Sequence, residues 1–215
     1  MKAVMKRLFG EEFNNLLFMN LITAVLCVPV VTAGPALMAL MGTLIKIVDN
    51  RCELNRLKEY KSLFKKKFFK GVLLEALVIA YAVAILWCLS LADALGEDGV
   101  VLRVATLAVG FVACVVSVPV WLILAGVEMP FGAAFWNGVC LALGRFPLAA
   151  MSALWVYGVI LAAVLFYPVS LAFVLMIMIS AMAAIALAIL WPAYGPLVLD
   201  ACEEESKSLE ERNEI

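Results

Sequence analysis

The chain has 215 residues, of which 66% are hydrophobic and only 15% are charged. Soluble domains are about half apolar and, at this size, bury only about 70% of their chain's surface, so the composition excludes an ordinary water-soluble globule and indicates an integral membrane protein. A formal net charge of −1 and the absence of histidine also argue against nucleic-acid binding and against histidine-based catalysis.

The first apolar region, residues 16–48, is interrupted in its middle. Two prolines and a glycine fall within seven residues, from Pro29 to Pro35, and these residue types are strong helix breakers. The pattern predicts two short helices joined by a tight turn, at residues 15–31 and 35–48. Because each is near the lower limit of the roughly 20 residues needed to cross a bilayer, a re-entrant hairpin remains an alternative to a spanning one.

Longer apolar runs follow and bring the predicted number of crossings to six. These four spans are residues 71–91, 101–127, 147–166 and 169–190. With a cytoplasmic N-terminus, all but one of the 16 lysines and arginines fall on the cytoplasmic side, and Arg103 alone falls outside; this is the bias of the positive-inside rule. We therefore expect an all-α, polytopic helix bundle that forms one membrane domain, residues 1–199, with both termini cytoplasmic.

A basic segment precedes the third span. Residues 49–70 carry eight basic and three acidic side chains, and Leu57, Tyr60, Phe64 and Phe68 recur at helical spacing. This pattern predicts an amphipathic helix at residues 54–70 that lies along an anionic leaflet. The candidate lipid contacts are Lys65, Lys66, Lys67 and Lys70. Alternatively, these lysines only keep the loop from crossing the membrane.

A second cytoplasmic helix is predicted at residues 130–146, between the fourth and fifth spans. Its aromatic and aliphatic residues lie four apart and form one stripe, and the segment is too short to be a span. It is either a connector or a docking element for another subunit. The candidate docking residues are Phe131, Phe135, Asn137 and Arg145.

The C-terminal tail, residues 200–215, carries seven acidic and two basic side chains. It would lie on the same side of the membrane as the basic segment 49–70. A contact between the two is one hypothesis, and a solvated tail is the other, since exposed ion pairs contribute only about 0–1 kcal/mol each.

The predicted spans offer little chemistry. Glu75 lies one turn inside the third span, and it is a candidate intramembrane polar group because charges at this depth are costly and often functional. Ser180, Ala184 and Ala188 form a small-residue stripe suited to close helix packing. The six cysteines are scattered without a C-x-x-C pair. We expect no cofactor, no metal site and no enzymatic activity.

One sequence motif resembles a known family. An asparagine in the first span precedes a P-V-V-T-A-G-P-A turn by nine residues, as in the YesL-like family of bacterial integral membrane proteins. The motif residues are Asn20, Pro29, Thr32, Gly34 and Pro35. Residues 64–68 and 137–147 are also similar to stretches of that family. The resemblance implies a multi-pass protein of the bacterial plasma membrane with uncharacterised activity, whose relatives are often encoded beside carbohydrate-uptake systems.

Two functions follow as hypotheses. The first is an accessory or interaction subunit associated with carbohydrate uptake, whose partners would be the lipid bilayer and a carbohydrate transporter of the ATP-binding-cassette (ABC) kind. The second is a small transporter or channel that acts alone or as a homo-oligomer. Neither hypothesis involves nucleic acid.

Overall fold

The computed structural model describes residues 6, 10, 13–49, 56–167 and 177–213, and these residues form helices with no β-strand among them. The predicted all-α class is confirmed. The elements are α2 (Phe13–Leu26), α3 (Val30–Val48), α4 (Arg56–Ala94), the 3₁₀ turn η2 (Gly96–Gly99), α5 (Val100–Gly126), α6 (Phe131–Gly144), α7 (Phe146–Leu165) and α9 (Ile179–Asn213). In this described part, five helices are long and apolar enough to cross a membrane, while α2 and α6 are shorter.

Helix α3 runs antiparallel to the first half of α4. Near the start of α3, Pro35 lies so close to Gly71 that a Cβ built on this glycine would be 2.6 Å from the proline Cα. Near the end of α3, Lys46 forms an ion pair with Glu59. These two contacts place α3 alongside residues 59–75 of α4, which include most of its lysines, and leave the second half of α4 to other neighbours.

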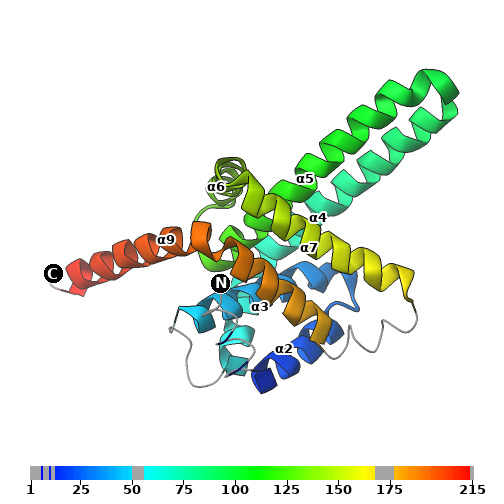
Figure 1. The fold of residues 1–215 in the computed structure, drawn as a ribbon. Helices are drawn as coiled ribbons and strands as arrows, with labels where there is room; N and C mark the ends of the chain where they lie inside the picture. Colours follow the sequence, from blue (N-terminus) through cyan, green and yellow to red (C-terminus); the bar gives the residue numbers. More distant parts are fainter. Residues whose placement is uncertain (1–5, 7–9, 11–12, 50–55, 168–176, 214–215) are drawn as a thin grey trace.

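The second half of α4 and the first half of α5, residues 76–114, form a hairpin whose outer part extends away from the other helices (Figure 1). We call this hairpin the arm. Its tip is closed by η2, and Gly96 precedes the acidic residues there with φ 60°, a conformation that glycine adopts without strain. Large apolar side chains cover the arm and remain exposed, among them Trp87 at 73% and Val101 at 78%. The arm therefore has the surface of a lipid-exposed hairpin.

The core lies where α3, the second half of α5 and α9 meet. Leu44, Leu122 and Leu187, one from each helix, are at most 1% exposed. The small-residue stripe predicted on the last span is buried as well: Ser180 and Ala184 are fully covered. Small side chains allow helix backbones to approach closely, which is the main source of helix association in a lipid environment.

The turn between the first two helices lies earlier than predicted. Helix α2 ends at Leu26 and α3 already begins at Val30, so the prediction of a turn from Pro29 to Pro35 was wrong, and Pro35 lies inside α3. A proline this near the start of a helix removes one backbone hydrogen bond. The neighbouring N–H, that of Gly34, donates to a side chain of α4, so the start of α3 is also held from outside the helix.

The described part of the predicted helix 54–70, residues 56–70, does not form a helix of its own. It belongs to the same unbroken helix as the predicted span 71–91, since α4 extends from Arg56 to Ala94, and residues 54 and 55 lie outside the described residues. The sequence there changes from basic to apolar without a helix breaker, so a single helix continues from the basic segment into the apolar one. Tyr60, expected to face lipid, is only 1% exposed and packs in the protein core; the prediction of a separate surface helix was wrong.

The remaining helices agree closely with the sequence. Helices α5, α6 and α7 start and end within two residues of the predicted segments 101–127, 130–146 and 147–166. The first part of the predicted span 169–190, residues 169–176, lies outside the described residues. The backbone of helix α9 continues into the acidic tail as far as Asn213. The side chains of the tail lie outside the described part, and so does the predicted contact between the tail and residues 49–70.

Candidate functional site

A buried hydroxyl pair joins α2, α3 and α4. The Tyr60 hydroxyl of α4 lies 3.1 Å from Thr23 Oγ1 of α2 and donates to the carbonyl oxygen of Ala36 in α3 at 3.3 Å. Thr23 Oγ1 also donates to the carbonyl oxygen of Met19 at 2.8 Å. Buried hydroxyls are costly unless they are hydrogen-bonded, so this arrangement fixes the mutual position of the three helices.

The five motif residues do not converge on one site. Thr32 donates its hydroxyl to the carbonyl oxygens of Leu26 and Pro29 and so closes the turn before α3. Asn20 is fully buried and accepts the backbone N–H of Ser180 at 2.8 Å, which ties α2 to the start of α9. These contacts are structural.

Gly34 and Glu75 meet where α3 crosses α4. The backbone N–H of Gly34 donates to Glu75 Oε2 at 2.8 Å, and a Cβ at position 34 would lie 2.5 Å from the carbonyl oxygen of Gly71. The carboxylate predicted as an intramembrane polar group therefore accepts an N–H near the start of α3. A carboxylate near a helix N-terminus is also favoured by the helix dipole.

Lysines of α4 hold the connector between α5 and α6. Lys67 Nζ donates to the carbonyl oxygen of Val127 at 2.9 Å, and Lys70 Nζ donates to that of Met129 at 2.7 Å. Lys66 Nζ lies 3.7 Å from Glu128 Oε1. Because Val127 caps the C-terminal end of α5, the positive charges also complement the dipole of that helix. Of the four predicted lipid-contacting lysines, three thus have partners within the protein.

Lys67 is unusual among these lysines because it is buried, with 3% exposure. It precedes the apolar segment 71–91 and lies among other cations. Burial, followed by repulsion from Lys70, lowers the pKa of Lys67 to about 8. Its hydrogen bond to the Val127 carbonyl offsets part of the cost of burying the ammonium group.

Helix α6 packs closely on α5 with one face and exposes the other. Three small residues at successive four-residue steps, Ala134, Gly138 and Ala142, are buried, and a Cβ on Gly138 would lie 2.6 Å from a Val120 methyl carbon. On the outer face, Trp136 is 65% exposed. Of the predicted docking residues, Phe131 and Phe135 stack at 6.4 Å, Asn137 donates to the Met129 sulfur at 3.4 Å, and Arg145 is an exposed residue between α6 and α7.

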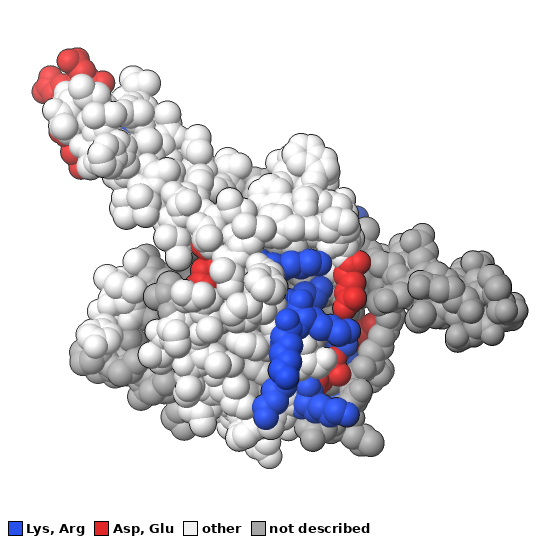
Figure 2. Space-filling view, turned by 180° about the vertical axis from the view of Figure 1, so that it is seen from behind, with Lys and Arg blue, Asp and Glu red and all other residues white. Residues whose placement is uncertain are grey.

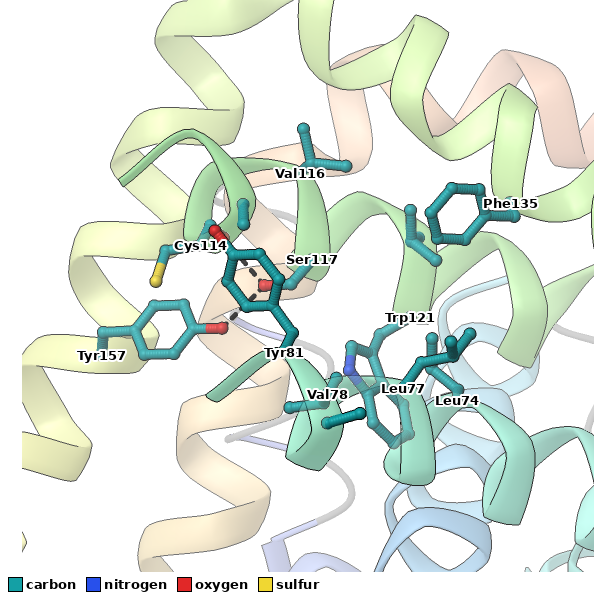
Figure 3. A pocket seen from close by; sticks show the side chains of 13 residues that line it. Leu74, Leu77, Val78, Tyr81, Cys114, Val116, Ser117, Trp121, Phe135 and Tyr157 are labelled. Carbon is teal, nitrogen blue, oxygen red and sulfur yellow. Dashed lines mark hydrogen bonds between the residues drawn. The ribbon is translucent and has the colours of Figure 1, made fainter. Parts of the chain in front are cut away.

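A cavity of about 500 Å³ lies between α4, α5, α6 and α7 (Figure 3). Its lining is mainly aliphatic and aromatic, and Phe135 of α6 and Trp121 of α5 form part of one wall. Its hydroxyl groups are already engaged: Ser117 Oγ lies 2.8 Å from the Tyr157 hydroxyl, and Tyr81 donates to the Val109 carbonyl oxygen at 2.9 Å. Such a lining suits the apolar chain of a ligand.

Within the described residues, no three His, Cys, Asp or Glu side chains gather in a way that could hold a metal ion.

Charged side chains are concentrated at two separate ends of the molecule. Lysines gather on one face of the body, and the acidic side chains at the tip of the arm lie far from them (Figure 2). The tip carries Glu97 and Asp98 in η2 and an ion pair between Asp93 and Arg103. This separation along the arm agrees with the polarity expected from the positive-inside rule.

Sequence reasoning missed several residues that the structure places at these contacts. Tyr60 was assigned to a lipid-facing stripe, although a tyrosine in an apolar helix commonly seeks a hydrogen-bond partner. Tyr194, fully buried, donates to the Leu122 carbonyl oxygen at 3.0 Å. Trp136 and Lys61 were not singled out, because their importance depends on which face of each helix is covered.

Comparison with protein families finds a match to part of the chain. A family model described as "Protein of unknown function, DUF624" matches residues 13–91, which comprise α2, α3 and nearly all of α4. Neither the curated proteins nor the solved structures contain a match. The matched segment includes the motif turn and the Tyr60 contacts, and the match is consistent with the resemblance to YesL-like proteins noted in the same segment.

Proposed function

We propose that this chain is an accessory or interaction subunit of the bacterial cell membrane, associated with carbohydrate uptake. The observation that carries the interaction role is the outer face of α6. The association with carbohydrate uptake and the bacterial membrane rest on the resemblance to YesL-like proteins, whose relatives are encoded beside such systems.

The outer face of α6 has the features of a docking surface. Phe135, Trp136 and Leu143 are 38%, 65% and 63% exposed, and aromatic anchors dominate the binding energy of protein interfaces. The opposite face is fixed on α5 by small residues, and the preceding connector is held by Lys67 and Lys70. A surface that is rigid before binding loses less conformational freedom when a partner binds.

The alternative, a small homo-oligomeric transporter or channel, is favoured by a different observation. The arm exposes apolar side chains along its length, and Trp87 and Leu86 are 73% and 66% exposed. A second copy of the chain could cover this surface in the membrane as well as lipid could. Transport would then depend on the assembled copies.

The test is a pull-down of the tagged full-length protein from native membranes in mild detergent, with bound proteins identified by mass spectrometry. We expect a carbohydrate permease and its ATPase to be recovered with the wild type. Trp136→Ala should lower their recovery about tenfold or more, since truncation of an aromatic anchor costs about 2 kcal/mol or more.

The matched control is Leu154→Ala, which truncates a side chain of α7 that is 77% exposed. It should leave recovery unchanged. Recovery of the protein alone as a defined oligomer would support the transporter alternative. Equal recovery with the two variants would contradict docking through α6.

A further inference from the structure

A groove, separate from the cavity between α4, α5, α6 and α7, lies on the flank of the protein between α2 and the first turns of α4. Its volume is about 530 Å³. Leu21 and Val25 of α2 form one wall, and Phe64 of α4 contributes to the other. Lys61 and Lys65 also line it, and their four-residue spacing places both on the same face of α4. The groove therefore combines an apolar wall with two neighbouring ammonium groups.

These two lysines differ from the other lysines around them. Lys46, Lys66, Lys67 and Lys70 each have a carboxylate or carbonyl partner in the protein. Among the described residues, no carboxylate forms an ion pair with Lys61 or Lys65, and both side chains belong to exposed residues. Their positive charge is available to a ligand.

The outer face of α2 shows what kind of ligand fits beside these charges. Phe18, Leu21 and Val25 are spaced as one helical stripe, and all are about half exposed or more. An exposed apolar stripe next to a row of basic side chains is typical of helices that lie in the headgroup region of a membrane. Anionic headgroups contribute about 1 kcal/mol of attraction for each nearby basic side chain.

We propose that this groove binds an anionic phospholipid, with its phosphate between Lys61 and Lys65 and an acyl chain along Leu21, Val25 and Phe64. The charges account for the phosphate and the apolar wall accounts for the chain, so a lipid uses both features. A free phosphate would use only the lysines. This inference does not depend on the role proposed for α6.

The experiment measures lipids retained by the purified full-length protein. The protein is exchanged into equal amounts of phosphatidylglycerol and phosphatidylcholine, and bound lipids are counted by native mass spectrometry. We expect the wild type to retain phosphatidylglycerol preferentially. The double variant Lys61→Gln/Lys65→Gln should lose that preference by about tenfold or more, as expected from the attraction of two basic side chains. Equal retention of the two lipids by the wild type would overturn the proposal.

The matched control changes the neighbouring charge on the same helix. Lys66→Gln removes one positive charge outside the groove, whereas Lys65→Gln removes one inside it, and only the latter should weaken the preference. If both variants weakened the preference for phosphatidylglycerol equally, the preference would come from the general surface charge, and the proposed binding site would be wrong.

Two further measurements test the groove itself. Val25→Trp fills the apolar wall at a position that is 59% exposed and leaves both lysines in place, so it should lower phosphatidylglycerol retention without lowering the melting temperature. Unchanged retention would contradict the acyl-chain assignment. Displacement of the lipid by millimolar inorganic phosphate would show that the lysines bind free phosphate instead.

Discussion

At position 34 the chain has no room for a side chain. A Cβ there would lie 2.5 Å from the carbonyl oxygen of Gly71 and 2.9 Å from the Cβ of Glu75. The first of these atoms is backbone and cannot move aside without separating α3 from α4. We therefore predict that Gly34→Ala destabilises the protein by about 1–3 kcal/mol, as overpacking does in close contacts. The measurement is the thermal unfolding of the purified protein in detergent.

The control for this prediction is Gly158→Ala in α7. Beyond its own turns of helix, no atom lies within 4 Å of a Cβ at that position, and alanine is the better helix former by up to about 1 kcal/mol. This variant should be neutral or slightly more stable. If both variants melt at the same temperature, the close approach of Gly34 to α4 does not contribute to stability.

The motif residues show which features of single residues the sequence could predict. The prolines and the glycine correctly indicated an interruption near residue 30, because their backbone preferences are local. Pro35 lies inside α3, and the residue before it, Gly34, donates to Glu75, which is 41 residues away in the chain. A contact at such separation leaves no mark in the local pattern.

At the scale of elements, the position of α6 depends on the connector that precedes it. We predict that Lys67→Met raises the amide exchange rate of Val127, Glu128 and Met129 about tenfold, because the carbonyl oxygen of Val127 loses its charged donor. Hydrogen bonds to charged groups contribute about 1.5–3 kcal/mol. The measurement is hydrogen–deuterium exchange of the detergent-solubilised protein.

Lys66→Met provides the comparison for this variant. It removes the adjacent lysine, whose ion pair with Glu128 is exposed and 3.7 Å long, and pairs of this kind contribute little. The exchange of the connector should remain near that of the wild type. Similar acceleration in both variants would mean that the net charge of α4, and not the Lys67 hydrogen bond, holds the connector.

Helix positions were predicted well where the apolar pattern has clear ends. The predicted segments 101–127 and 147–166 correspond to α5 and α7 because turns and charged residues bound them. The segment 54–70 was predicted as an amphipathic helix, but the sequence could not show that its face carrying Tyr60 and Lys67 packs against other helices. Amphipathic patterns identify a face; they do not identify what covers it.

At the scale of the whole molecule, α3 lies beside the basic half of α4. Glu75 is about 6 Å beyond the start of the apolar segment 71–91, given a rise of 1.5 Å per residue, and it contacts Gly34 near the start of α3. Val28 in the turn between α2 and α3 precedes Gly34 by about six residues, a further rise of about 9 Å, so the turn is about 15 Å into a hydrocarbon layer of about 30 Å. This arrangement favours the re-entrant alternative for residues 15–48 over a hairpin that crosses completely.

This topology can be tested with single cysteines, introduced after the native cysteines are replaced by alanine and labelled with a membrane-impermeant maleimide. Glu97→Cys at the tip of the arm should react from outside intact cells, and Lys65→Cys should react only in inverted vesicles. Val28→Cys lies in the turn and is 80% exposed in the isolated protein. It should react from neither side, because lipid covers a turn at the middle of the bilayer. Labelling of Val28→Cys from outside, at the rate of Glu97→Cys, would instead establish a complete crossing and contradict the depth inferred from the Gly34–Glu75 contact.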